Sequence, residues 1–269
     1  MGKRLHFNCS LAIMLSLLLT TTGGYAQNTD SDFVPYSGQD GKDVVWVPTP
    51  QALVDTMLSM AKVTSADYVI DLGSGDGRLV ITAAQRGATA LGIEYNPDMV
   101  ELARRTATEE GASAKATFEQ ADIFEFDFSK ATVVTLFLLP ELNLRLRPII
   151  LDMKPGTRIV SNTFDMGDWE SDRTINIPYP ENWTTAHLWI VPAKVDGTWY
   201  FDGGQAKLTQ TFQNISGTLT IGNTEINITG KLDGDKISFN ADGTNLTGTV
   251  SGNTISGTST GGGSWRATR

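Results

Sequence analysis

The chain has 269 residues, 21 of them basic and 30 acidic, which gives a formal net charge of −9 at pH 7. This length accommodates one large domain and a smaller one, and the acidity makes nucleic acids and anionic membranes unfavourable partners. The single cysteine, Cys9, and the two histidines, His6 and His187, exclude a disulfide framework and a His/Cys metal cluster.

Residues 1–26 have the features of a secretory signal peptide. Lys3 and Arg4 precede an apolar core at 11–19, and Gly24-Tyr25-Ala26 offers small residues for cleavage. The apolar core is too short for a transmembrane helix, and no later segment reaches that length. We therefore expect an exported chain, periplasmic or secreted, without a transmembrane helix in its mature form. Cleavage would remove two basic residues and no acidic one, which changes the net charge from −9 to −11.

A polar segment at 27–44 is expected to be a loosely held arm before the first helix. Thr49 has the hydroxyl of an N-cap residue, and Pro50 suits the first helical position. Apolar residues then recur at helical spacing to about Lys62. This helix either packs on the edge of a sheet or, with residues 48–50, covers a bound ligand.

From Asp67 short apolar runs alternate with amphipathic segments, which is typical of a doubly wound parallel sheet. Strands are expected at about 68–71, 90–95, 117–120, 132–139 and 157–163, and helices at 78–86, 97–110 and 141–153. Pro148 lies inside the last of these helices and predicts a kink or two short helices. An antiparallel pair at 174–177 and 188–191 completes a domain predicted to span 45–195.

The turn after the first strand, residues 71–77, has glycines at three alternate positions. Glycine lets the backbone approach a ligand closely, and open α/β sheets bind ligands at the carboxyl ends of their strands. We expect the turn to present its amides at a helix N-terminus. A dinucleotide fingerprint would require a glycine where Arg78 stands. Asp76 is expected to be a turn residue.

Two acids indicate the class of ligand. Asp71 would repel a pyrophosphate but attract a sulfonium or an amino-acid ammonium. Glu94 ends the second strand, 23 residues later, where its carboxylate can accept two hydrogen bonds from a ribose diol. Asp71, the glycines and Glu94 together resemble the S-adenosylmethionine site of class I methyltransferases. The alternative, a glycine-rich turn beside two solvated acids, leaves this spacing unexplained.

The resemblance implies a set of cofactor-binding residues. They are Asp71, Gly73, Ser74, Gly75, Glu94, Tyr95, Asp122 and Ile123. In this family Asp71 and the first two glycines contact the methionine end and Glu94 holds the ribose. Asp122 meets the adenine amine, with Ile123 beside the ring. The alternative for Asp122 is a loop acid or a helix cap.

The fourth strand leads into Leu139-Pro140-Glu141, at the edge that faces the transferred methyl in this fold. The Asn-Pro-Pro-Tyr pattern of enzymes that methylate amide or adenine nitrogen is absent. With residues 47–50, 71–78 and 158–161, this region resembles a protein-lysine methyltransferase group that includes the enzyme acting on the ATP synthase c-subunit. The resemblance covers about 45–192. It implies S-adenosylmethionine-dependent N-methylation, with a protein lysine as one acceptor.

Pro140 and Glu141 are the candidate catalytic residues. Glu141 would orient a cationic acceptor, or it is simply the acid that the dipole of a helix favours at its N-terminus. No dedicated base is required, because desolvation favours a neutral amine and positioning supplies most of the rate. We expect His187 to be structural rather than a base. Trp169 either lines the acceptor channel or packs in the core.

After about Val195 the composition changes to threonine, glycine, asparagine and serine, and helical periodicity disappears. A weak repeat begins at Asn214, Asn227 and Asn245, each time as a short alternating strand, and Asp233-Gly234 is a hairpin turn. We predict a small antiparallel sheet or partial barrel at 196–269. Its polar faces contact the cell envelope or are merely solvated.

The predicted fold class is therefore α/β: a Rossmann-like class I methyltransferase sheet followed by a small antiparallel all-β C-terminal domain. The predicted function is methyl transfer from S-adenosylmethionine to an acceptor nitrogen. Because this cofactor is made in the cytoplasm, the export signal leaves an alternative, an exported binding module that has lost turnover and associates with the envelope through its β domain. The intact Asp71, Glu94 and Asp122 argue against that alternative.

Overall fold

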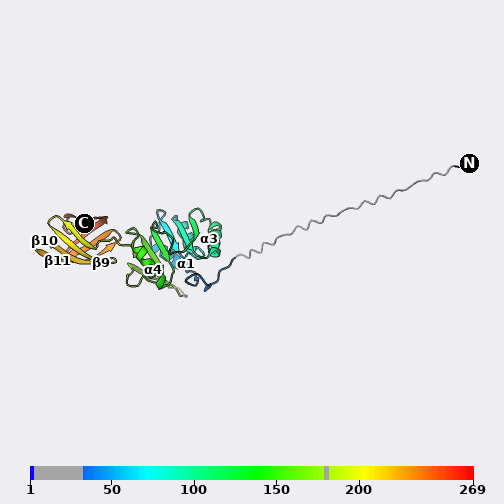
Figure 1. The fold of residues 1–269 in the computed structure, drawn as a ribbon, viewed down its shortest axis with the longest axis horizontal. Coiled ribbons are helices and arrows are strands. Elements are labelled where there is room, and N and C mark those ends of the chain that lie inside the picture. The colour runs from blue at the N-terminus through cyan, green and yellow to red at the C-terminus, as the bar shows by residue number, and fades with distance from the viewer. Residues whose placement is uncertain (3–32, 179–181) are drawn as a thin grey trace. The chain divides into compact units, whose positions relative to one another are not determined.

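The computed structural model describes residues 1–2, 33–178 and 182–269. Residues 3–26 of the predicted signal peptide and residues 27–32 of the predicted arm lie outside this description. From Val34 onward the chain contains an α/β sheet followed by a β-barrel (Figure 1). None of the helices within the described ranges has the length and hydropathy needed to cross a bilayer.

The first folded part is a seven-stranded mixed sheet with the order β3-β2-β1-β4-β5-β7-β6. Its strands are β1 (Tyr68–Leu72), β2 (Thr89–Glu94), β3 (Ala116–Gln120), β4 (Val133–Leu136), β5 (Arg158–Asn162), β6 (Arg173–Asn176) and β7 (Thr185–Ile190). Strands β1 to β5 pair in parallel, and β7 pairs antiparallel with both β5 and β6. The Rossmann-like order and the final antiparallel pair are thus confirmed. The strand order reverses between β1 and β4, where sheets of this kind bind ligands.

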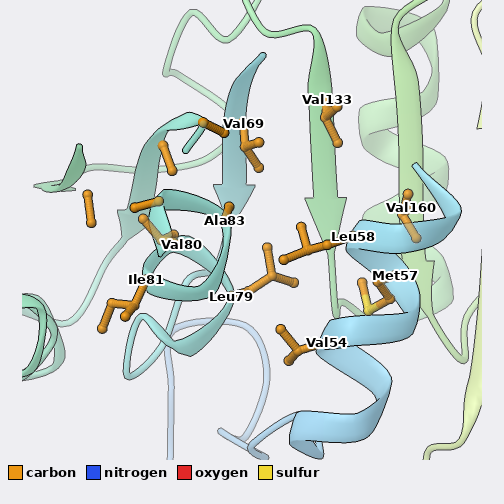
Figure 2. Packing of buried hydrophobic residues seen from close by; sticks show 14 of the residues in the cluster. Val54, Met57, Leu58, Val69, Leu79, Val80, Ile81, Ala83, Val133 and Val160 are labelled. Atoms are coloured by element: carbon orange, nitrogen blue, oxygen red, sulfur yellow. The ribbon is translucent and has the colours of Figure 1, made fainter. Parts of the chain in front are cut away.

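Helices cover the sheet because each carries an apolar face at helical spacing. They are α1 (Gln51–Met60), α2 (Arg78–Gln85), α3 (Pro97–Glu109) and α4 (Pro140–Leu151). Val54, Met57 and Leu58 of α1 are fully buried and lie beside α2 on one face of the sheet (Figure 2). Of the two roles considered for this helix, packing on the sheet is observed, against the inner strands β5 and β7 and not at the edge. Met57 also lines the cavity described below.

Three local predictions need correction. Pro50 is the N-cap of α1, and no side chain caps that helix. The hydroxyl of Thr49 instead accepts a hydrogen bond from Nδ2 of buried Asn162, at 3.1 Å, because a buried amide needs an acceptor. Helix α4 is one continuous helix around Pro148 and not two short ones. Strand β4 is shorter than expected, since the apolar residues after Leu136 leave the sheet.

The second folded part is a closed antiparallel barrel in which each strand pairs with the next and the last pairs with the first. Its strands are β8 (Gly197–Phe201), β9 (Gly204–Thr211), β10 (Asn214–Ile221), β11 (Thr224–Asp233), β12 (Lys236–Ala241), β13 (Thr244–Ser251), β14 (Thr254–Ser259) and β15 (Ser264–Thr268). The predicted antiparallel domain is confirmed and the partial barrel is a complete one. Closure removes the unpaired edges that an open sheet would expose.

The three repeats fall on β10, β11 and β13, and the glycine within each allows close packing of neighbouring strands. A Cβ at Gly217 would lie 2.0 Å from the carbonyl oxygen of Lys207, and one at Gly230 would lie 2.2 Å from that of Ser238. A side chain at either position would therefore push the strands apart. The repeat reflects the tight curvature of a small barrel.

The barrel contacts the sheet domain through the loop between β9 and β10. The ring of Phe212 stacks on Trp169, with centroids 5.8 Å apart and planes 14° apart. Nε2 of Gln213 donates to the carbonyl oxygen of Glu170 at 2.8 Å. Trp169 is fully buried and its carbonyl accepts the indole hydrogen of Trp189 at 2.7 Å. Of the two roles considered for Trp169, core packing is the one that the structure supports.

Candidate functional site

A cavity of about 210 Å³ lies at the carboxyl ends of β1, β2 and β4. Residues 39–49 line it on one side, and the loops after the four strands β1 to β4 supply most of the remainder. All eight predicted cofactor residues, Asp71, Gly73, Ser74, Gly75, Glu94, Tyr95, Asp122 and Ile123, are among the lining residues. Parallel strands end at one edge of a sheet, which brings together side chains that are far apart in the sequence.

Asp71 is the buried acid of this cavity. Asp71 lies near the carboxyl end of β1 and pairs with Thr135 of β4. Oγ1 of Thr135 donates to Oδ1 of Asp71 at 2.6 Å. Burial raises the pKa of Asp71 to about 7, and the negative charges of Glu94 and Asp76 add to this rise, while the Thr135 hydrogen bond opposes it. A cation beside this buried carboxyl group would stabilise its ionised form. The site thus fits a ligand that places a positive charge near Asp71.

The glycine turn uses its amides internally. Gly73, Gly75 and Gly77 have φ values of +81°, +54° and +81°, which other residues avoid. The amides of Gly73 and Ser74 both donate to the carbonyl oxygen of Ile93, at 2.8 and 3.0 Å. The expectation that these amides face a ligand is therefore wrong, because they join the turn to β2. With these donors occupied, this part of the turn does not provide the nest of amides that binds a phosphate.

Glu94 holds the neighbouring backbone and can also bind a ligand. Its Oε2 accepts the amide hydrogen of Gly75 and its Oε1 that of Asn96, each at 2.9 Å. A carboxylate has about four acceptor sites, so one lone pair remains on each oxygen. These two lone pairs are what a ribose diol needs. The carboxylate is held in place by backbone donors before any ligand binds.

Asp122 faces the cavity from the loop after β3. Its Oδ1 accepts the amide hydrogen of Phe124 at 2.9 Å, and its Oδ2 forms an ion pair with the ammonium of Lys42. The hydrogen bond from Lys42 is the main reason that the pKa of Asp122 lies below its usual value. The carboxylate is thus ionised and remains an acceptor for an amine.

The arm contributes more to the wall of the cavity than the sequence suggested. Residues 36–46 are folded by three backbone hydrogen bonds, including those from Gly38 to Trp46 and from Trp46 to Gln39. A Cβ at Gly75 would lie 2.5 Å from Nε1 of Trp46, so the indole lies directly against the glycine turn. The guanidinium of Arg78 donates to the carbonyl oxygen of Thr49 at 2.9 Å. The expected loose arm, 27–44, is therefore wrong over residues 36–44, and the apolar Trp46-Val47 pair directly after it was the signal for its packing.

The remaining predicted residues lie in different settings. A Cβ at Gly92 would lie 2.5 Å from the hydroxyl of Ser74, so this buried hydroxyl lies against β2, where it has no hydrogen-bond partner among the described residues. Pro140 and Glu141 occupy the exposed first turn of α4 and do not line the cavity. Their catalytic role stays a prediction.

His187 is held between two polar groups and does not line the cavity. Its Nε2 lies 3.2 Å from the carbonyl oxygen of Thr163, and its Nδ1 lies 2.9 Å from Oγ1 of Thr174. A carbonyl oxygen only accepts, so Nε2 carries the hydrogen and Nδ1 accepts from the hydroxyl. These contacts support the structural role predicted for His187.

The aromatic end of the cavity was not predicted from the sequence. Phe137, Leu138 and Leu139 follow β4 and line the cavity together with Phe164 and Trp183. Each aromatic residue belongs to a different segment, so no local pattern connects them. The site thus has a carboxylate end and an apolar, aromatic end. Such a cavity can hold a polar cofactor and exclude water from the group that reacts with it.

Comparisons with known proteins agree with this geometry. The family model described as the ANTKMT methyltransferase domain matches residues 71–173. A protein-lysine N-methyltransferase of Saccharolobus islandicus is 38% identical over 151 residues, which cover 55% of this chain and 94% of the relative. The human lysine N-methyltransferase of the ATP synthase c-subunit is 30% identical over 158 residues, but the match spans only 60% of that protein and 58% of this chain.

A solved structure shows the same fold with a ligand bound. It is an RNA methyltransferase of Salinibacter ruber in complex with S-adenosyl-L-homocysteine, 48% identical to this chain, with a TM-score of 0.53. The match covers 55% of this chain and 96% of that one.

Proposed function

Because this chain belongs to the S-adenosylmethionine-dependent methyltransferase family that includes the protein-lysine N-methyltransferases, we propose that it methylates the ε-amine of a lysine in a protein. The chain is a methyltransferase and its cofactor is S-adenosylmethionine. Our proposal concerns the methyl acceptor, a lysine in a protein. The observation that carries it is the apolar end of the cavity, formed by Phe137, Leu138 and Leu139, in the same cavity as the buried Asp71.

The residues of the cavity fit the chemistry of amine methylation. S-adenosylmethionine supplies an electrophilic methyl group on a sulfonium. The lysine nitrogen forms a bond to that methyl carbon while the carbon–sulfur bond breaks, and the sulfur keeps the electron pair. The amine must be neutral to attack, and the buried apolar side chains of Leu136 and Leu138 in the cavity lining favour this form by withholding water. Positioning then supplies most of the rate.

An RNA acceptor is the second candidate, because the relative from Salinibacter ruber carries that description. Two observations favour protein over RNA. The chain has a net charge of −9, which disfavours a polyanion. The two cationic side chains that line the cavity, Lys42 and Arg78, are each paired with an acid, Asp122 and Asp76 respectively. They are thus partly neutralised as phosphate ligands.

The acceptor class is tested by transfer of labelled methyl groups. Purified chain and S-adenosylmethionine tritiated on its methyl group are incubated with total bacterial protein, with the same protein after acetylation of its lysines, and with total bacterial RNA. We expect label in the untreated protein, recovered as methyl-lysine after hydrolysis, and its loss after acetylation. Label in RNA that nuclease releases, with none in protein, would overturn the proposal.

We also propose that residues 1–26 direct export of this enzyme, on the basis of the basic start, the apolar core and the small residues before Gln27. The enzyme then acts either before export or on cofactor that reaches the outer compartment. Contact of the barrel with the envelope is a further part of this proposal, and the polar outer faces of its strands support it.

A further inference from the structure

Three aromatic side chains meet at the apolar end of the cavity. The ring centroids of Phe137 and Phe164 are 6.2 Å apart, those of Phe137 and Trp183 are 5.7 Å apart, and those of Phe164 and Trp183 are 5.5 Å apart. The planes of the first pair are within 22°, whereas Trp183 meets them at 61° and 52°. Trp183 is 37% exposed, and all three rings line the cavity. The group is therefore an open aromatic corner and not closed core.

The backbone is strained at two points of this corner. Thr163, which precedes Phe164, has a φ of +61°, and Trp183 has a φ of +70°. A β-branched or bulky residue with positive φ is an outlier. Strain of this kind persists only where neighbouring structure holds it, and it concentrates at binding sites.

Hydrogen bonds from β7 and α4 hold the strained segment. The amide of Thr163 donates to the carbonyl oxygen of Thr185 at 2.7 Å, and its carbonyl accepts from His187. The fully buried Asn143 of α4 donates through Nδ2 to the carbonyl oxygens of Phe164, at 3.3 Å, and Asp165, at 3.1 Å. Asn143 and His187 are thus positioning residues, which fix where the ring of Phe164 lies.

We propose that Phe137, Phe164 and Trp183 bind the lysine side chain as its ammonium and methylammonium forms, an inference that rests on the proposed function. Aromatic faces carry negative charge density and attract cations, most strongly where water is partly excluded. After each transfer the product is a methylammonium cation. The aromatic corner holds this cation at the cavity while the cofactor is exchanged. Loss of an N–H proton to water then gives a neutral methylated amine, which attacks the methyl group of the next cofactor, so the enzyme adds more than one methyl group.

The experiment separates a cation site from a merely apolar wall. The purified full chain, saturated with S-adenosyl-L-homocysteine, is titrated by calorimetry with the capped peptide Ala-Lys(trimethyl)-Ala. A second titration uses the carbon isostere of that peptide, in which carbon replaces the quaternary nitrogen. We expect the cationic peptide to bind at least about fivefold more tightly. Equal binding of both peptides, or no binding of the cationic one, would overturn the inference.

Variants show whether the three rings are responsible. Trp183→Leu and Phe164→Leu keep apolar volume but remove the aromatic face, and each should reduce the preference for the cation to less than twofold. Trp183→Phe should retain part of it. Tyr200→Leu is the matched control, because this exposed barrel residue does not line the cavity. A preference that survives both leucine variants contradicts the assignment.

The affinity for S-adenosyl-L-homocysteine distinguishes this inference from the function on which it rests. It should stay within about twofold in the aromatic variants, which also shows that they fold. If the unaltered chain does not bind S-adenosyl-L-homocysteine, the proposed function fails and not the aromatic site alone. If it binds this ligand but has no preference for the cation, only the aromatic site fails.

Discussion

At the scale of single residues, Asp71 determines much of the behaviour of the site. It is 6% exposed, and the hydroxyl of Thr135 donates a hydrogen bond to its carboxyl group. Burying a carboxylate beside two other acids is unfavourable unless a cation joins it. The buried carboxylate therefore lowers the stability of the ligand-free chain, and a cationic cofactor would offset this cost.

The first prediction is that Asp71→Asn stabilises the ligand-free chain at high pH. The pKa of Asp71 is about 7 when folded and about 3.9 when unfolded. Between these values the folded chain binds more protons, so stability falls as pH rises, and the loss is complete above the folded pKa. The penalty amounts to about 4 kcal/mol. The asparagine side chain is not ionisable, so the variant should have a flatter stability curve.

Chemical denaturation between pH 5 and pH 9 measures this difference. The control is Asp202→Asn, in an exposed turn of the barrel, which should leave the pH dependence unchanged. Parallel curves for Asp71→Asn and the unaltered chain would show that the carboxyl is not the group that titrates.

The second prediction concerns Glu94. Its oxygens accept two backbone amides and keep two lone pairs for a diol. Glu94→Ala removes hydrogen bonds to a charged acceptor, each of about 1.5–3 kcal/mol. We therefore expect affinity for S-adenosyl-L-homocysteine to fall by at least about tenfold. Calorimetry measures it, with the exposed Glu101→Ala on α3 as the control. Unchanged affinity would remove Glu94 from the cofactor site.

At the scale of elements, the segment 39–49 forms one wall of the cavity. Side chains attach it at several points. Lys42 pairs with Asp122 and lies 4.8 Å from the ring centroid of Tyr95, and Nε2 of Gln39 lies 3.5 Å from the sulfur of Met99. These contacts join the segment to loops of β2 and β3 and to α3. The wall is thus held to the cofactor-binding loops by side-chain contacts.

The third prediction is that Lys42→Met speeds ligand release. Losing the ion pair to Asp122 loosens the wall, so the dissociation rate of S-adenosyl-L-homocysteine should rise by at least about threefold. Stopped-flow tryptophan fluorescence follows the release, because Trp46 and Trp183 both line the cavity. Lys130→Met, on an exposed loop, serves as the control. A rate equal to that of the unaltered chain would mean that Lys42 does not hold the wall.

At the scale of the whole molecule, the barrel and the sheet domain share an aromatic contact. Phe212 of the barrel stacks on Trp169, and the guanidinium of Arg147 on α4 lies 5.3 Å from the centroid of its ring. Phe212 also has a φ of +52°, an unusual value for a bulky residue. The barrel thus contributes to the packing of the sheet domain.

The fourth prediction follows from this contact. Phe212→Ala should lower the free energy of unfolding by about 2 kcal/mol, roughly half the value for a fully buried phenylalanine, because this ring is half-buried. Urea denaturation measures the change. Tyr200→Ala, at 58% exposed, should change it far less. An equal effect of both variants would show that the stacking on Trp169 contributes little.

The fifth prediction concerns residues 1–26. A fusion of residues 1–30 to an alkaline phosphatase without its own signal should be active in a bacterial periplasm, because the basic start and apolar core direct secretion. Replacing Leu17 and Leu18 with arginine interrupts the apolar core and should abolish that activity. Equal phosphatase activity of both fusions, or none from either, would contradict export by this segment.

Much of the fold was predictable because it depends on local patterns. Strands of five residues, amphipathic helices and glycine turns follow from side chains within a few positions of one another. The carboxylate end of the site was predictable for a related reason. Asp71, Glu94 and Asp122 each stand at or just after the carboxyl end of a parallel strand, and such ends share one edge. Strand order alone therefore brings them to one cavity.

Other features depend on contacts between distant segments. Phe137, Phe164 and Trp183 come from three segments, and only the pairing of β5 with both β4 and β7 brings those segments together. Closure of the barrel needed the pairing of β15 with β8, two strands that are far apart in the sequence. The ion pair between Lys42 and Asp122 is also a long-range contact. The burial of Trp169 likewise depends on segments that are distant in the sequence. Local sequence thus specified the elements and the acids of the site. Tertiary packing determined the aromatic end, because no local period indicates which segments will meet.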